Sequence, residues 1–338
     1  MPIPILVPIL AGIILVVLPT PGRSAQPEVE KGTWHTAAPM PTKRTEVAAA
    51  ALDGKIYVVG GFEKPSLANV LNFAITRSVE MYDPATDRWT SKAPLPVGLH
   101  HVGIDVVDGR LYVIGGYAQS ALSVWKPVAT VYAYDPAADS WTERAPMPTA
   151  RGALSVTEHN GKLYAIGGFD RKANNAQVEV YDPVQNVWSI AAPLPTPRDH
   201  LAAATVAGKI YAIGGRANGD YSQNLSVVEM YDPAIDRWKR VSDFPTARSG
   251  ITAAVVEDKI YVFGGEGTVG TFNENEAYDP ARDTWQRLLP MPTARHGLGS
   301  AVVKGRINVI SGGPTPGGSF SDLNEVFTPM LGSGFKSN

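Results

Sequence analysis

Short apolar runs separated by turn residues recur along most of the chain. In the first full unit, the small apolar run 45–52 is followed by Asp53-Gly54 and then by the β-branched and aromatic run 56–59. Asp-Gly favours a tight hairpin, because both central residues of a type I′ turn need positive φ. The alternating stretch 79–82 and a stretch that begins at Trp89 follow. The unit therefore predicts four antiparallel strands.

Two motifs repeat along the chain with a period of about 50 residues, a length typical of propeller blades. One is a turn, a strand and a glycine pair, and the other is Tyr-Asp-Pro followed by Trp. One four-stranded blade cannot bury both of its faces, but neighbours stacked around an axis can. The copies of the first motif are 53–61, 108–116, 160–168, 207–215, 257–265 and an altered 304–312, and those of the second are 82–89, 134–141, 181–188, 231–238 and 278–285.

The glycine pair, Tyr-Asp-Pro and Trp at these offsets resemble the kelch repeat, over residues 34 to about 328. The sixth unit departs from it, with Ser311-Gly312 in place of the glycine pair and Phe327 in place of the tyrosine. No Trp follows there, and the segment around Trp34 looks like a fourth strand without its first three. The resemblance implies an all-β, six-bladed kelch β-propeller whose N-terminal strand completes the last blade. We expect the repeated Tyr and Trp to fill the contacts between blades.

The N-terminal segment does not fit the repeats. An apolar run at 3–18 is followed by small and polar residues, which predicts a signal peptide over 1–25 or an uncleaved membrane anchor. We expect the propeller over 26–329 and a disordered Gly/Ser-rich tail over 330–338. This organisation predicts an exported protein, periplasmic or extracellular, that contacts a membrane only if the leader is retained.

The amino-acid composition excludes several classes of function. The formal net charge of −2 over 338 residues gives no indication of a nucleic-acid partner. The absence of cysteine excludes disulfides and thiolate metal sites, and also the Tyr–Cys crosslink of galactose oxidase, a kelch enzyme. No His and carboxylate spacing suggests a tight metal site, so neither a metal nor a cofactor is expected.

An arginine stands sixteen places before the glycine pair in five of the six units. In the predicted fold these positions begin the innermost strands, so the arginines are expected to converge on one mouth of the central channel. Guanidinium groups suit carboxylates and phosphates, and some kelch propellers hold acidic peptides with arginines at this point. Alternatively, the arginines brace the turn through backbone carbonyls or a neighbouring carboxylate. The five are Arg44, Arg151, Arg198, Arg248 and Arg295, and Leu99 takes the place in the second unit.

Loops after the glycine pairs are expected on the same face, where binding residues usually lie. His101, Trp125 and Arg216 are the ligand-binding candidates added to the five arginines. Weaker loop candidates are Glu63, Lys64, Lys126, Asp170, Arg171, Tyr221, Glu266 and Phe272. Residues that could perform acid/base chemistry beside the strand starts, or that are simply part of kelch packing, are Glu46, Asp199, His101, His200 and His296.

These features predict an exported binding module that recognises an anionic ligand at an Arg-lined mouth. Its partner would be an acidic peptide, an acidic saccharide or another protein, and no catalytic residue is assigned. The first alternative is an enzyme like the sialic-acid mutarotases found among exported bacterial kelch proteins, or an epimerase of acidic sugars. It would use Glu46 and the arginines. The second is a cell-envelope scaffold in which the arginines pair with internal carboxylates.

Overall fold

The computed structural model describes residues 32–67, 74–121 and 123–330. The predicted signal peptide at 1–25 and the tail after Met330 lie outside the described residues. Across the described part of the chain, none of the helices has the length and apolar character needed to cross a membrane.

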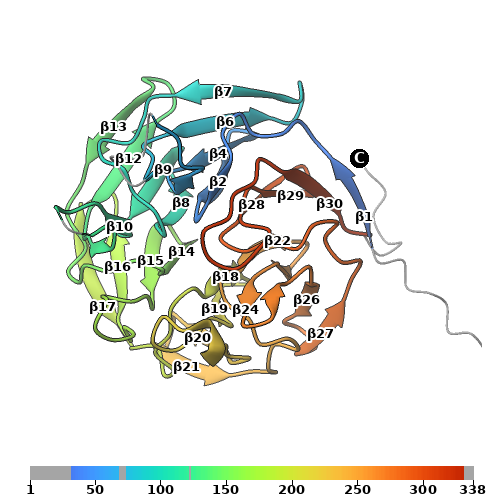
Figure 1. The fold of residues 1–338 in the computed structure, drawn as a ribbon. Helices are drawn as coiled ribbons and strands as arrows, with labels where there is room; N and C mark the ends of the chain where they lie inside the picture. Colours follow the sequence, from blue (N-terminus) through green and yellow to red (C-terminus); the bar gives the residue numbers. More distant parts are fainter. Residues whose placement is uncertain (1–31, 68–73, 122, 331–338) are drawn as a thin grey trace, which may run out of the picture. The chain divides into compact units, whose positions relative to one another are not determined.

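Six four-stranded antiparallel sheets stand around a central axis (Figure 1). The prediction of an all-β, six-bladed propeller is confirmed. The innermost strands are β3 (Ala48–Leu52), β8 (Gly103–Val107), β14 (Ser155–His159), β18 (Ala202–Val206), β22 (Thr252–Val256) and β28 (Gly299–Val303). The second strands are β4 (Lys55–Val59), β9 (Arg110–Ile114), β15 (Lys162–Ile166), β19 (Lys209–Ile213), β23 (Lys259–Phe263) and β29 (Arg306–Ile310).

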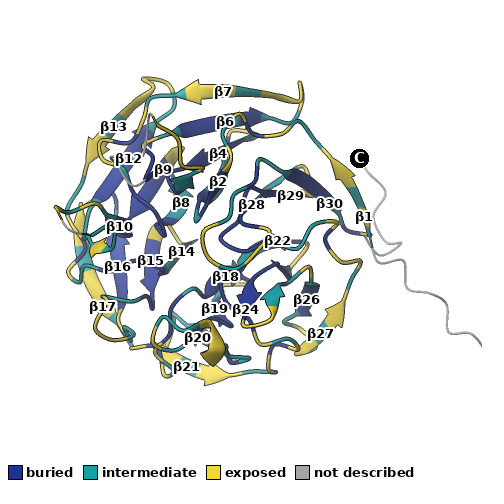
Figure 2. Ribbon diagram, in the orientation of Figure 1, coloured by how far each residue is buried: buried dark blue, intermediate teal, exposed yellow. Residues whose placement is uncertain are grey.

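The outer half of each blade follows in chain order. The third strands are β6 (Val79–Asp83), β12 (Val131–Asp135), β16 (Val178–Asp182), β20 (Val228–Asp232), β26 (Asn275–Asp279) and β30 (Asn324–Thr328). The outermost strands are β7 (Arg88–Lys92), β13 (Ser140–Glu143), β17 (Val187–Ala191), β21 (Arg237–Arg240), β27 (Thr284–Arg287) and β1 (Thr33–Thr36). Figure 2 shows the second and third strands largely buried and the outermost strands largely exposed.

Short elements lie at one end of the ring, in the loops after the glycine pairs and, for β2, just before the first innermost strand. They are the strand pairs β2 (Arg44–Thr45) with β5 (Phe62–Glu63), β10 (Tyr117–Ala118) with β11 (Lys126–Pro127) and β24 (Glu266–Gly267) with β25 (Gly270–Thr271), and the 3₁₀ helix η2 (Tyr221–Gln223).

The ring is closed by its N-terminal strand. β1 pairs with β30 in the last blade, and Trp34 lies opposite Phe327 in that register. The Trp34 indole packs on the rings of Phe327 and Phe263 and donates to the carbonyl of Leu289. The prediction that the first described strand completes the last blade is confirmed.

The repeated Tyr and Trp join neighbouring blades, as predicted. In the fourth blade, the rings of Tyr231 and Trp238 pack against each other in a tilted arrangement with their centroids 5.1 Å apart. The Trp238 indole donates to the carbonyl of Ala192, in the segment that leaves the previous blade. Asp236 accepts from the Tyr231 hydroxyl and from the Ala192 amide. One motif therefore fills the seam with aromatic surface and satisfies the backbone of the connecting segment.

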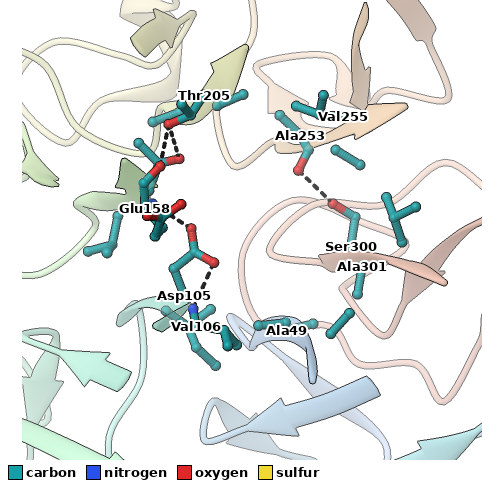
Figure 3. Close-up of a pocket in the computed structure, with 18 residues that line it drawn as sticks. Ala49, Asp105, Val106, Glu158, Thr205, Ala253, Val255, Ser300 and Ala301 are labelled. Carbon is teal, nitrogen blue, oxygen red and sulfur yellow. Dashed lines mark hydrogen bonds between the residues drawn. The ribbon is translucent and has the colours of Figure 1, made fainter. Parts of the chain in front are cut away.

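Small side chains line the channel along the axis. Alanines such as Ala49, Ala203 and Ala253 surround a hollow of about 360 Å³ (Figure 3). Asp105 faces it, and its carboxylate accepts from the amides of Val106 and Glu158. Burial raises the pKa of Asp105 to about 6, because desolvation disfavours the charged form.

Candidate functional site

The five arginines do not line the channel mouth, so that expectation is wrong in its geometry. All five are completely buried inside their own blades. Arg198 donates to the Glu229 carboxylate at 2.6 Å and to the carbonyls of Thr196 and Ala212. A buried cation is tolerated only with such partners, because its desolvation is costly. The pairs are Arg44–Glu80, Arg151–Glu179, Arg198–Glu229, Arg248–Glu276 and Arg295–Glu325, with N–O distances of 2.5–2.8 Å.

The second blade shows what the arginines do. It has Leu99 where the others have arginine and Tyr132 where they have the paired glutamate, and both side chains pack in one apolar cluster. Arginine and glutamate are thus lost together. The pair braces the strand start inside a blade, which is the structural alternative considered above. The glutamate at the second position of the third strand, present in the same five blades as the arginine, was a sequence signal for this pairing that the prediction did not use.

A ring of backbone hydrogen bonds encircles the throat of the channel, two residues after each strand-start position. Each ring member from His101 to Gly297 donates its amide to the carbonyl of the member before it, and the Val47 amide closes the ring on Gly297. Every member has a left-handed backbone, with φ between 51° and 65°. This conformation costs a non-glycine residue about 1–3 kcal/mol and is common at functional sites. The members are Glu46, His101, Ala153, His200, Gly250 and Gly297.

Ionisable side chains meet over this throat. Glu46 lies 3.1 Å from His101 Nε2 and 3.5 Å from His296 Nε2. Arg216 donates to Glu266 at 2.7 Å and to His200 Nε2 at 2.8 Å. Burial lowers the pKa of His101 well below its ordinary value, mainly because desolvation disfavours the charged imidazolium.

Two carboxylates of the network stay ionised. Burial opposes the charge on Asp199, but the bond from His200 Nδ1 and the nearby Arg216 hold its pKa below the ordinary value. Burial likewise opposes the charge on Glu266, and His296 and Arg216 lower its pKa. The throat is therefore a polar site with preserved negative charge.

A pocket of about 360 Å³, here called the mouth pocket, opens above the throat. Its aromatic walls are Phe62 on β5, Trp125 before β11, Tyr221 on η2 and Phe320 before β30. Its ionisable lining is Glu46, His101, Arg216, Glu266 and His296. The volume falls at the small end of the range of ligand pockets, and the mixture of apolar walls with few polar groups is typical of them.

The structure brings His101, Trp125 and Arg216 together in this pocket, with Tyr221 and Glu266 from the weaker candidates. Phe62 and Phe320 were not predicted, although Phe62 directly follows a glycine pair and so had to lie near the mouth. Residues that are not among those lining the pocket are Glu63, Lys64, Lys126, Asp170, Arg171 and Phe272. Arg171 instead lies over the Trp125 ring, with its guanidinium carbon 5.1 Å from the ring centroid.

Comparison with known proteins defines the class. The KLHDC2/KLHL20/DRC7 Kelch-repeats domain matches residues 86–243 and 155–328, and the Kelch motif matches 43–96. The chain belongs to the kelch-repeat family. Kelch propellers typically serve as protein-interaction modules.

The two relatives described next match this chain over less than a quarter of their own length. The chain is 33% identical to Kelch-like protein 35 of Mus musculus over 140 residues, which are 41% of this chain and 22% of that protein. It is 33% identical to Beta-scruin of Limulus polyphemus over 137 residues, which are 40% of this chain and 14% of that protein. A solved structure described as "Structure of YjhT" superposes with a TM-score of 0.74 at 19% identity, covering 88% of this chain and 98% of that one. That similarity confirms the propeller fold.

Proposed function

We propose that this kelch propeller is a binding module whose mouth pocket takes a saccharide. The observation that carries the proposal is the combination of aromatic walls and a charged floor in one pocket. A sugar ring has apolar C–H faces that pack on aromatic rings and hydroxyls that both donate and accept. Carboxylates accept from hydroxyls, and a guanidinium donates to them.

The aromatic wall is held ready for a ring-shaped ligand. Trp125 packs against Phe62, with centroids 6.0 Å apart, and against His100 at 4.9 Å. A pre-positioned aromatic side chain loses little conformational entropy on binding. Tyr221 also lines the pocket and is 40% exposed, and the guanidinium carbon of Arg216 lies over its ring, 5.8 Å from the centroid.

Whether the saccharide is acidic or neutral depends on the charged residues that line the pocket. The anionic-ligand hypothesis was based on five arginines, and the structure pairs each of them inside a blade. Arg216 remains as the guanidinium that lines the pocket, and Glu46 and Glu266 line it too. An acidic saccharide would therefore depend on Arg216, whereas a neutral one would use the carboxylates as well.

Titration with matched neutral and acidic monosaccharides, followed by calorimetry or protein NMR, tests the proposal. Trp125→Ala and Tyr221→Ala should each weaken binding about tenfold or more, and Arg216→Gln should weaken the acidic ligand selectively. Ile235→Ala is the control, because Ile235 is 62% exposed on the outside of the ring. The proposal fails if no saccharide binds, or if the saccharide affinity is unchanged by both aromatic substitutions.

A catalytic use of the same pocket is the second candidate. Glu46 has a left-handed backbone and contacts His101 and His296, which is the kind of placement an acid/base residue needs. A mutarotase or epimerase of acidic sugars would interconvert anomers or epimers. NMR spectra of freshly dissolved sialic acid, with and without the protein, check this, and equilibration no faster than in buffer removes the candidate.

A further inference from the structure

We propose that Glu46, His101 and His200 form a binding site for a divalent transition-metal ion at the throat of the channel. One possible ligand atom from each of the three residues lies within 4.8 Å of the others. Two imidazole nitrogens and one carboxylate oxygen are a ligand set used by zinc and iron(II). The site goes beyond the saccharide proposal, because metal binding is measured with no organic ligand present.

Hydrogen-bond partners determine the tautomer of His101. His100 Nε2 lies 2.8 Å from the carbonyl of Val124, which can only accept, so His100 carries its proton there. His100 Nδ1 is then an acceptor and lies 2.5 Å from His101 Nδ1, which must be the donor. The Nε2 atom of His101 is left with its lone pair free, and it is aimed at the throat.

That lone pair meets a second acceptor. His101 Nε2 lies 3.1 Å from Glu46 Oε2, and the His101 side chain is only 4% exposed. Two acceptors at this distance repel each other unless a cation lies against both. A metal ion about 2.1 Å from each atom fits a separation of about 3 Å with an angle near 90°. The buried contact is therefore shaped for a cation.

The other two histidines of the throat are oriented in the same way. His200 Nδ1 donates to Asp199 at 2.5 Å, which leaves its Nε2 lone pair toward the throat. His296 Nδ1 lies 3.1 Å from the carbonyl of Gly313, so its Nε2 also faces inward. Metal-binding histidines usually anchor their second nitrogen to a carboxylate or carbonyl in this manner. Arg216 now donates to His200 Nε2 and would have to release it, keeping its bond to Glu266.

The local charge matches a divalent ion. Among the described residues that contact these histidines, the carboxylates are those of Glu46, Asp199 and Glu266, and Arg216 supplies one positive charge. Three carboxylates against one guanidinium leave two negative charges around the throat while the imidazoles are neutral. Since Glu46 and His101 also line the mouth pocket, the open side of a bound ion would face the ligand.

The test is a zinc titration of the full chain, without a histidine tag and stripped of metal with a chelator. Calorimetry should show one equivalent bound with a micromolar or lower Kd. Glu46→Gln and His101→Gln should each weaken binding by at least tenfold, and His200→Gln by a similar factor. His159→Gln is the matched control, because His159 lies at the opposite end of its innermost strand and should leave the Kd unchanged.

A measurement on the wild type covers the case in which a substitution unfolds the protein. Cobalt(II) added to the stripped chain should give a visible ligand-field band, and zinc should move the Nε2 resonance of His101 in ¹⁵N-histidine spectra. The proposal is overturned if zinc does not bind saturably at neutral pH, which would mean that a proton bridges Glu46 and His101. Binding that survives both Glu46→Gln and His101→Gln would overturn it too. Saccharide binding by the metal-free chain tests the proposed function and does not bear on the metal site.

Discussion

The buried arginine–glutamate pairs can be tested by giving one blade the chemistry of another. In the fourth blade, we would replace Arg198 with leucine and Glu229 with tyrosine, singly and together. These are the residues that the second blade carries as Leu99 and Tyr132. Because both versions occur in one molecule, the design uses a packing arrangement that the fold already accommodates.

The expected magnitudes follow from burial. The side chains of Arg198 and Glu229 are 0% and 5% exposed. Removing either partner leaves an uncompensated buried charge, which costs about 3–5 kcal/mol. The double substitution removes both charges and leaves a size mismatch, which costs about 1–3 kcal/mol. The coupling energy between the two positions should therefore be at least about 3 kcal/mol.

Guanidinium unfolding of the four proteins, followed by tryptophan fluorescence, completes the double-mutant cycle. Thr196→Val can be added, since the Thr196 hydroxyl donates to Glu229 and Val97 stands at the equivalent place. Saccharide and zinc affinities should stay within twofold in every folded variant. If the stability losses of the two single substitutions simply add in the double variant, the pairing is refuted. A selective loss of ligand affinity would show that the arginines contribute to the binding site.

Three further predictions address other parts of the ring. Asp105→Asn should remove a fall in stability of about 3 kcal/mol between about pH 4 and pH 7, because the pKa of Asp105 rises from 3.8 unfolded to about 6 folded, so ionisation disfavours the folded state. The measurement is the pH dependence of the unfolding free energy, since the asparagine NH2 would face one of the two amides that the carboxylate accepts from and so shifts the stability at every pH; an unchanged pH profile contradicts the prediction. Gly297→Ala should weaken zinc binding far more than Gly250→Ala. A Cβ added at Gly297 would lie 2.6 Å from the carboxyl carbon of Glu46, whereas one added at Gly250 would lie 3.5 Å from its nearest atom. Equal zinc affinities of the two variants would show that Glu46 tolerates displacement. Trp34→Ala should lower the free energy of unfolding by about 2–4 kcal/mol through lost packing at the closure, and a loss below about 1 kcal/mol would mean that the strand pairing alone holds the ring.

The sequence was sufficient for the architecture because each blade repeats its own local signals. Asp53-Gly54 and its equivalents mark the hairpins, and the Tyr and Trp positions mark the seams. The unpaired segment around Trp34 was enough to predict the closure, since the sixth unit lacked a fourth strand. These features are local or are repeated, so they can be recognised without coordinates.

The candidate site was only partly predictable. His101, Trp125 and Arg216 were found because they lie near strand starts or in long loops. The orientation of the arginines was missed, because side-chain direction at one residue decides between the channel and the blade interior, and the glutamate that occurs with each arginine was not considered. The tautomer of His101 depends on His100 and on the carbonyl of Val124, which only the folded chain places together.

The closure of the ring has a consequence for how the protein is made. β1 at Thr33–Thr36 pairs with β30 at Asn324–Thr328, so the first described strand finds its partner only near the end of the chain. At about 5–20 residues per second, a ribosome needs roughly 15–60 s to make the intervening chain. Until then β1 has no partner in its blade, and earlier blades can assemble only as an open arc. The last pairing is thus a checkpoint for completeness: a truncated chain cannot close, and its open edges would be accessible to chaperones and proteases.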